Sequence, residues 1–283
     1  MISTEQTGVP AGSMMLDVDG VQLAVCREGD GQAVICLHAI GHGGGDFAGF
    51  TTAFRSQFEI VRIDWPGQGR SGPDTHPASA ARYAQLLGGV VDQLGITAPI
   101  LVGNSIGGAA AILHARQRPV RALVLCDTGG LVRVSAIVRA TCACFVAFFS
   151  AGERKARWFG WAFALYYRYL VLPRPAAVEQ RERIIHSGPV IARILREAWQ
   201  SFGKPDADLR AQAEALDLPI WLAWAKSDRV IPLLMCMPSI RRMKRARVTK
   251  FRGGHSAFLE DPEAFNAGFR EFVDAINSPG AAL

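Results

Sequence analysis

Short apolar runs alternate with amphipathic stretches along most of the chain. A continuous apolar run is typical of a strand buried on both faces, whereas apolar residues spaced three or four apart are typical of a helix. On this basis, buried strands are expected at residues 33–37, 59–63, 100–102, 120–126, 220–224 and 248–251. Helices are expected at residues 46–57, 79–94, 105–116 and 261–276, and through the basic run 241–247. Asp46 and Asp261 are expected to cap the first and last of these helices.

A hairpin precedes these strands, because residues 14–18 and 21–26 flank Asp19-Gly20, a dipeptide that favours a tight antiparallel turn. The alternation that follows predicts an α/β fold with a doubly wound, mostly parallel sheet. It stops at about residue 128 and resumes at about 216, with helical patterning and no convincing strand between. Residues 1–127 and 216–283 are therefore expected to form one core domain, into which residues 128–215 insert as a helical cap.

One junction of this pattern carries candidate chemistry. Residues 99–111 read Pro-Ile-Leu-Val-Gly-Asn-Ser-Ile-Gly-Gly-Ala-Ala-Ala, so Gly-x-Ser-x-Gly stands where an apolar strand meets a helix. Gly103 and Gly107 suit an abrupt turn that exposes the hydroxyl of Ser105. So short a motif also occurs by chance in ordinary strand-to-helix turns. Its position between a strand and a helix favours a nucleophilic serine.

Composition narrows the class of protein. Of the 283 residues, 49% are apolar and 20% are charged, which is typical of a globular chain with a sizeable core. Residues 1–8 carry no basic residue and no apolar run, so no signal peptide is indicated and a cytoplasmic location is expected. The most hydrophobic segment, residues 140–149, is about half as long as the roughly 20 residues that cross a bilayer. No membrane span is therefore expected.

Cysteines and basic residues give weaker indications. The six cysteines show no paired framework, so reduced, buried thiols are expected. No second ligand cluster accompanies Cys142-x-Cys144, so no metal is expected, nor any other cofactor. The formal net charge is +6, and residues 241–247 are dense in Arg and Lys. Since no aromatic residues interrupt this run, it is expected to be a solvated helix face rather than a surface for an anionic membrane or a nucleic acid, and no nucleic-acid partner is expected.

A serine nucleophile needs a histidine base and a carboxylate that orients the histidine. His255 follows the last predicted strand through two glycines, and Asp228 follows the strand before it. Both therefore belong to loops at the sheet edge where Ser105 is expected. Asp127, directly after the strand 120–126, is the alternative carboxylate.

Several blocks together resemble the α/β-hydrolase superfamily, in its cap-bearing branch with a serine nucleophile. The resemblance covers residues 14–276 apart from the insertion. It rests on His38-Ala-Ile-Gly, Asp64-Trp-Pro-Gly-Gln-Gly-Arg-Ser, Gly103-Asn-Ser-Ile-Gly-Gly, Ser227-Asp-Arg-Val-Ile-Pro and Gly254-His-Ser, with the triad in the order Ser, Asp, His. It implies that Ser105 is the nucleophile, His255 the general base and Asp228 its orienting carboxylate. It also implies an oxyanion hole made by the backbone N–H groups of Ile106 and Ile40.

The loop after strand 33–37 leaves one alternative open. The segment His42-Gly-Gly-Gly45 also matches a lipase-type oxyanion motif. It begins four residues after His38, where the block that contains Ile40 begins. Ala39 and Ala225 stand where relatives usually have glycine. His38 is expected to brace the oxyanion loop rather than to take part in catalysis.

The cap insertion is rich in aromatic residues. Trp158, Trp161, Leu165 and Tyr169 form one helical stripe, and Phe159, Phe163, Tyr166 and Leu170 form an adjacent one. One stripe is expected to pack the cap, and the other to roof an apolar pocket over Ser105. Trp158, Phe159 and Tyr166 are the candidate substrate-binding residues.

The expected function is hydrolysis of a small or medium hydrophobic carboxylic ester through an acyl-enzyme. One alternative is carbon–carbon bond hydrolysis of a vinylogous diketone, because Gly-Asn-Ser-x-Gly-Gly also resembles the meta-cleavage-product hydrolases, although residues 40–45 lack the Gly-Pro-Gly usual there. Lactone hydrolysis is another. A ligand-binding relative without turnover is disfavoured by the complete set of Ser, His and Asp. The sequence indicates neither the oligomeric state nor the natural substrate.

Overall fold

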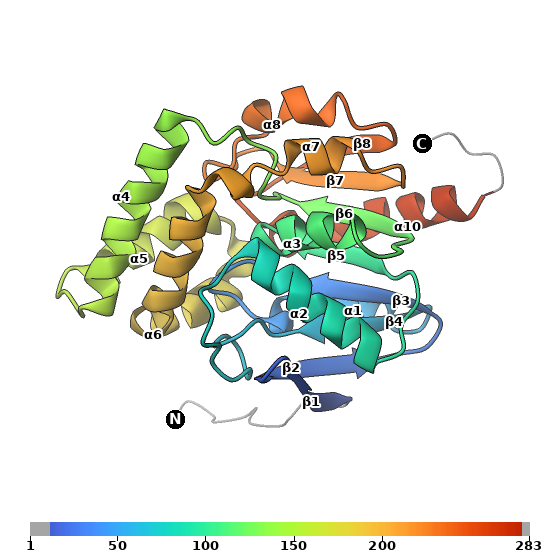
Figure 1. Ribbon diagram of the computed structural model, residues 1–283, viewed down its shortest axis with the longest axis horizontal. Coiled ribbons are helices and arrows are strands. Elements are labelled where there is room, and N and C mark those ends of the chain that lie inside the picture. Colours follow the sequence, from blue (N-terminus) through green and yellow to red (C-terminus); the bar gives the residue numbers. More distant parts are fainter. Residues whose placement is uncertain (1–11, 279–283) are drawn as a thin grey trace.

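The computed structural model of the chain describes residues 12–278, and an eight-stranded sheet runs through it in the order β1-β2-β4-β3-β5-β6-β7-β8 (Figure 1). The strands are β1 (Ser13–Val18), β2 (Val21–Glu28), β3 (Gln32–Leu37), β4 (Phe58–Ile63), β5 (Ile100–Asn104), β6 (Ala122–Cys126), β7 (Ile220–Ala225) and β8 (Ala246–Phe251). Strand β2 pairs antiparallel with β1 and β4, and all other neighbours are parallel. The expected hairpin and mostly parallel sheet are confirmed.

Helices cover both faces of the sheet. The core helices are α1 (Ala48–Phe54), α2 (Ala80–Gln93), α3 (Ile106–Ala115), α7 (Arg210–Glu214), α8 (Leu233–Ile240), α9 (Ala257–Glu260) and α10 (Pro262–Asn277), with a 3-10 turn, η1 (Gly44–Phe47), before α1. Helices α1 and α10 pack together on one face, and α2 packs on α3 on the other (Figure 1). Because helices cover both faces, the central parallel strands β5, β6 and β7 are buried along their whole length.

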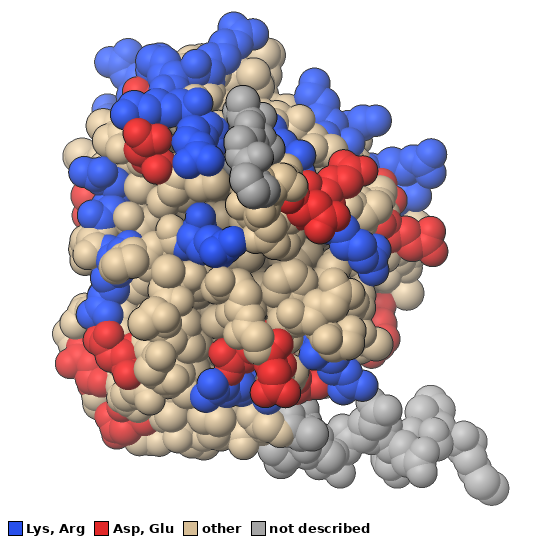
Figure 2. Space-filling model, turned by 90° about the vertical axis from the view of Figure 1, so that its right-hand side faces the viewer, with Lys and Arg blue, Asp and Glu red and all other residues tan. Residues whose placement is uncertain are grey.

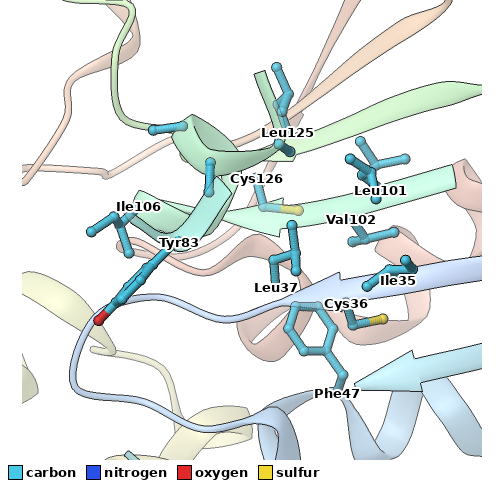
Figure 3. Close-up of a cluster of buried hydrophobic side chains, with 14 of the residues drawn as sticks. Ile35, Cys36, Leu37, Phe47, Tyr83, Leu101, Val102, Ile106, Leu125 and Cys126 are labelled. Atoms are coloured by element: carbon cyan, nitrogen blue, oxygen red, sulfur yellow. The ribbon is translucent and has the colours of Figure 1, made fainter. Parts of the chain in front are cut away.

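The centre of the core lies where β3, β5 and β6 run side by side. Every residue of β5 and β6 is buried. Figure 3 shows side chains from these strands, among them Leu37, Val102 and Cys126, gathered with Phe47 and Ile106 in one cluster. Because all three strands end at this cluster, the loops that follow them are held on a rigid base.

Residues 128–215 form helices and loops only and lie at one end of the sheet, left in Figure 1; this segment is called the cap below. Its elements are α4 (Ala136–Glu153), α5 (Phe159–Tyr166), a π-helical turn η2 (Tyr167–Val171), η3 (Pro175–Ala177), α6 (Val178–Phe202) and η4 (Pro205–Ala207). Helices α4 and α6 pack along each other. By contrast, α7 packs on α3 and α8, so it sits with the core although it lies inside the expected cap range.

Helix α4 is longer than residues 140–149, the apolar segment whose short length led us to expect no membrane span. Among residues 12–278 it is the one helix long and apolar enough to cross a bilayer, by length and composition alone. Four of its residues, including Cys142 and Phe149, are buried against the rest of the cap. Its packing on α6 accounts for it as a cap helix.

The basic run 241–247 is not the helix face that its composition suggested. Helix α8 ends at Ile240, and the run continues as a turn into β8, because the backbone from Ala246 onward pairs with β7. Arg247 is largely buried, and its guanidinium lies over the rings of Trp221 and Phe272. Figure 2 shows Lys and Arg gathered at the top of the face opposite the cap, where α8 and β8 lie in Figure 1.

Neither expected helix cap forms through its side chain. Asp46 lies inside η1, and its carboxylate contacts the Nδ1 atom of His42 instead. The carboxylate of Asp261 accepts the Arg252 N–H at 3.1 Å. The carboxylates of Asp46 and Asp261, which could cap an isolated helix, thus bond to a buried histidine and to a neighbouring loop instead.

Cys36, Cys126, Cys142, Cys144 and Cys236 are free thiols, and Cys144 is the exposed one among them; Cys26 is buried as well. The expected cytoplasmic location rests on residues 1–8, which lie outside the described residues.

We predict that Gly107→Ala destabilises the fold by roughly 1–3 kcal/mol or more. A Cβ atom at this position would lie 2.3 Å from the Leu37 carbonyl oxygen and 2.9 Å from that of His38. Gly49→Ala in α1 is the matched control, because a Cβ atom there meets nothing within 4 Å and should stabilise the helix by up to about 1 kcal/mol. Chemical denaturation measures both. Equal stability of the two variants would contradict the close approach.

Candidate active site

Ser105 lies at the sharp turn between β5 and α3. Its backbone has φ of +53°, a left-handed conformation that costs a non-glycine residue roughly 1–3 kcal/mol. Hydrogen bonds hold it there: the Ser105 N–H donates to the Cys126 carbonyl at 3.0 Å, and the Ser105 carbonyl accepts the N–H groups of Gly108 and Gly129 at 3.1 and 3.0 Å. The turn is thus fastened to β6, the neighbouring strand.

The side chain of Ser105 faces a cavity of about 570 Å³ between the core and the cap. It makes no capping hydrogen bond to α3, although Ser105 occupies the N-cap position where serine usually makes one. His255 lines the same cavity. Ser105 and His255, which are expected to act together, therefore line the same cavity.

His255 and Asp228 are in direct contact. The Nδ1 atom of His255 lies 3.0 Å from Oδ2 of Asp228, and both side chains are buried. The other carboxylate oxygen of Asp228 accepts the N–H groups of Val230 and Ile231 at 2.8 and 2.9 Å. With its acceptors used in this way, Asp228 fixes the ring so that Nδ1–H donates and Nε2 is free to accept a proton.

The alternative carboxylate, Asp127, is bonded elsewhere. Its two oxygens accept the N–H groups of Ala225 at 2.7 Å and Ala257 at 3.1 Å. Burial raises the pKa of Asp127, and the negative charge of Asp228 raises it further. Asp127 therefore ties the end of β7 to the segment after His255 rather than contacting the imidazole.

Two further residues that the sequence did not single out hold the His255 loop. The Glu260 carboxylate accepts the N–H groups of Gly254 at 2.6 Å and His255 at 3.2 Å. The Asn104 amide donates to the carbonyl of His255 at 3.0 Å. Asn104 directly precedes Ser105, so it connects the turn that carries the serine with the loop that carries the histidine.

The charges around His255 change its basicity. Burial lowers the pKa of its imidazole, but the carboxylates of Asp228, Asp127 and Glu260 act in the opposite direction and outweigh it. The net effect raises the pKa above that of a free imidazole. The three carboxylates therefore stabilise the protonated form of His255.

Two unpaired backbone N–H groups belong to residues that line the cavity beside Ser105. Ile40 and Ile106 are both buried, and neither N–H donates to an acceptor among residues 12–278. Buried N–H groups without a partner are rare in proteins. Both donors are therefore available to a group bound in the cavity.

His38 holds the loop that carries Ile40. Its Nδ1 atom lies 2.7 Å from the Ala39 carbonyl, and its Nε2 accepts the Trp65 N–H at 2.9 Å. Burial lowers the pKa of His38 despite nearby carboxylates, which favours the neutral ring that these bonds require.

The lipase-type alternative fits the geometry less well. The Gly44 N–H already donates to Asp64 at 2.7 Å, and the N–H of the preceding Gly41 donates to Gln68 at 2.6 Å. His42 does line the cavity, with its Nδ1 atom 2.5 Å from Oδ2 of Asp46. Of the segment 42–45 only His42 lines the cavity, so the segment brings a second buried His–Asp pair to it.

The cavity is mainly apolar, and the cap supplies much of its lining. Tyr166, one of the three expected substrate-binding residues, faces it, with Tyr167, Leu195 and Trp199 beside it. The expectation for the other two is corrected by the structure. Phe159 is buried among cap rings such as Phe148 and Phe163, and Trp158 is 51% exposed on the cap surface.

Residues 12–278 contain no group of three or more His, Cys, Asp or Glu side chains that could hold a metal ion. The chemistry that the site offers comes from its hydroxyl, imidazole, carboxylate and backbone N–H groups.

Comparison with known proteins identifies the family. Over 269 residues the chain is 28% identical to a pimeloyl-[acyl-carrier protein] methyl ester esterase of Xanthomonas campestris, covering 88% of this chain and 97% of that protein. It is 25% identical to a 2-hydroxy-6-oxononadienedioate/2-hydroxy-6-oxononatrienedioate hydrolase of Comamonas testosteroni, covering 87% and 88%. A thermophilic esterase of Thermogutta terrifontis has a similar fold, with a TM-score of 0.79, 19% identity and coverage of 95% and 100%. The family model that matches residues 34–267 is that of the alpha/beta hydrolases, and the chain belongs to this family.

Proposed function

We propose that the protein is a serine hydrolase that cleaves a small or medium hydrophobic carboxylic ester through an acyl-enzyme. The observation that carries the proposal is the His255–Asp228 hydrogen bond at the edge of a cavity that also holds the strained Ser105. In this proposal Ser105 attacks the ester carbonyl and His255 takes its proton. Asp228 keeps the ring oriented and stabilises the imidazolium.

The oxyanion of the tetrahedral intermediate would be held by the N–H groups of Ile106 and Ile40. Donors already in place cost no reorganisation during the reaction, and the loss of one such donor typically lowers the rate by roughly 10²–10³-fold. His255 would then return its proton to the leaving alcohol, and a water molecule would hydrolyse the acyl-enzyme by the same steps. The apolar lining and a volume of about 570 Å³ support a hydrophobic substrate of modest size.

A second candidate reaction is hydrolysis of a carbon–carbon bond in a vinylogous diketone. The 25% identical relative from Comamonas testosteroni, which carries the name of such a hydrolase, supports it. The methyl ester esterase from Xanthomonas campestris supports ester hydrolysis to a similar degree. Lactone hydrolysis would use the same groups. A cytoplasmic location remains a prediction alongside each of these.

We predict that Ser105→Ala abolishes hydrolysis of p-nitrophenyl esters, from acetate to octanoate, and labelling by a fluorophosphonate probe. Removing the hydroxyl removes the atom that forms the acyl-enzyme. Ser187→Ala, on α6 and bonded only to the Arg183 carbonyl, is the control and should behave as the wild type. Turnover is followed by nitrophenolate absorbance and labelling by mass spectrometry.

Three results would contradict the ester assignment. Unchanged turnover in Ser105→Ala would remove the nucleophile from the mechanism. Rapid wild-type cleavage of a vinylogous diketone or a lactone, with no ester turnover, would move the function to the corresponding alternative. Absence of both turnover and probe labelling would favour a ligand-binding protein.

We predict that the kcat/KM of the wild type falls with decreasing pH, with a midpoint above about 6.5, the ordinary value for histidine. His255 must be neutral to act as a base, and its raised pKa moves protonation to higher pH. Asp228→Asn should lower kcat by roughly 10³–10⁴-fold. It should also move the acid limb to lower pH, since the imidazolium loses its carboxylate.

Asp217→Asn is the control for the pH profile, because Asp217 is exposed and pairs with Lys244. It should leave both kcat and the midpoint unchanged. An acid limb that stays in place in Asp228→Asn would contradict the assignment of the titrating group.

A further inference from the structure

The outward side of the cap exposes three large aromatic side chains. Trp158, Trp161 and Tyr169 are 51%, 70% and 67% exposed. They belong to the helical stripe that the sequence placed either in the cap core or over the pocket. The adjacent stripe takes those positions instead, because Phe159 and Phe163 are buried and Tyr166 faces the cavity. In the stripe with two tryptophans, Trp158 contacts Phe148 and Phe159 at one side only, and Trp161 and Tyr169 remain largely exposed.

An apolar groove of about 520 Å³ lies beside this stripe, between α4 and the segment formed by α5 and η2. Its lining is apolar or aromatic throughout, from Cys144, Phe145, Phe148, Ala162, Leu165, Tyr166, Tyr169 and Leu170. Helix α4 contributes further small apolar residues to the outside of the cap, with Ala140, Ala143 and Ala147 exposed. In Figure 1 this helix lies at the outer edge of the cap, away from the sheet.

Basic residues surround the same surface. Residues 128–178 contain seven Arg and Lys and a single acid, Glu153, so their formal excess equals the +6 of the whole chain. Arg154, Lys155 and Arg157 form the turn directly before Trp158, and all three are exposed. None of the three makes an ion pair within the described part of the chain, whereas Glu153 is paired with Arg196. The remaining residues of the protein are balanced in charge.

We propose that this surface binds a bilayer that contains anionic lipid. The cap outer face, as we name it, comprises Trp158, Trp161, Tyr169, the groove, and the basic residues Arg139, Arg154, Lys155 and Arg157; the nearby Arg168 is paired with Glu182. Trp and Tyr favour the level of the lipid headgroups, where an apolar ring and a polar edge are both accommodated. Each Arg or Lys near an anionic surface adds about 1 kcal/mol, which raises the binding constant roughly fivefold.

Charge argues for lipid over a second copy of the chain. A symmetric dimer through this face would bring Arg154, Lys155 and Arg157 of both copies together, and like charges placed close together oppose association. A span by α4 is not required either, because the helix keeps its packing on α6. The proposal is of a protein that lies on the membrane surface, and it does not rest on the hydrolase activity.

The test is binding of the full chain to vesicles of phosphatidylcholine alone and of equal parts phosphatidylcholine and phosphatidylglycerol. Co-sedimentation should show binding to the anionic vesicles and at least tenfold less to the neutral ones. Raising the salt concentration should weaken the binding, because exposed charges are screened. Tryptophan emission should shift to the blue on binding, and Trp158→Phe/Trp161→Phe should remove most of the shift.

Two double variants separate local charge from net charge. Arg154→Glu/Arg157→Glu should lower the binding constant at least tenfold. Arg241→Glu/Lys250→Glu alters the net charge by the same amount at exposed positions away from the cap, and should bind as the wild type does. Trp161→Ala/Tyr169→Ala should also weaken binding roughly tenfold through lost apolar contact. All these side chains are exposed, so thermal melting should show intact folds.

Three outcomes would overturn the proposal. The first is no sedimentation of the wild type with anionic vesicles at low salt. The second is an equal loss of binding in the two charge-reversal variants, which would indicate attraction by net charge alone. The third is a wild-type dimer in solution that Trp161→Ala/Tyr169→Ala converts to a monomer, which would assign the face to a second copy.

Discussion

The contact between the first turn of α3 and the end of β3 is the constraint on which the candidate site depends. It exists because Gly107 has no side chain, so that backbone can approach the Leu37 carbonyl closely. This approach brings the N–H groups of Ile106 and Ile40 to one cavity, although they belong to segments far apart in the sequence. The strained turn at Ser105 and the loop braced by His38 are positioned by the same contact.

Three buried carboxylates surround one imidazole, and they are accommodated in two ways. Asp228 contacts the ring, whereas Asp127 and Glu260 accept backbone N–H groups of the neighbouring segments. Buried charge is costly unless it is hydrogen-bonded, and here every carboxylate is. Glu260 also accepts the N–H of Arg174, so the network reaches the cap. The three carboxylates that favour a protonated His255 thus also connect segments that lie far apart in the sequence.

The sequence predicted the sheet well because continuous apolar runs between turn residues have few other interpretations. It also placed Ser105, Asp228 and His255 at one edge, since loops after parallel strands meet there. Asn104 and Glu260 could not be assigned in the same way, because their roles come from contacts across the tertiary structure. The basic run was misjudged because pairing of β8 with β7 outweighs local helical patterning.

The cap shows a different limit of prediction. Both of its aromatic stripes are apolar enough to be buried, so periodicity could not tell which one faces inward. Packing of α5 on α6 and α4 decides this, and it leaves Trp161 outside and Phe163 inside. Tyr166 faces both the cavity and the outer groove, which places a single side chain between the site and the surface.

The two ends of the cap meet at its base, where the Leu209 N–H donates to the Gly130 carbonyl at 2.8 Å. The insertion therefore leaves and re-enters the core at one point. Its length does not affect the distance between β6 and β7. Such a segment can change in size and sequence over evolution while the edge that carries Ser105 and Asp228 stays unchanged. In such a fold, the residues at the sheet edge and the residues of the insertion that line the cavity can therefore change independently of one another.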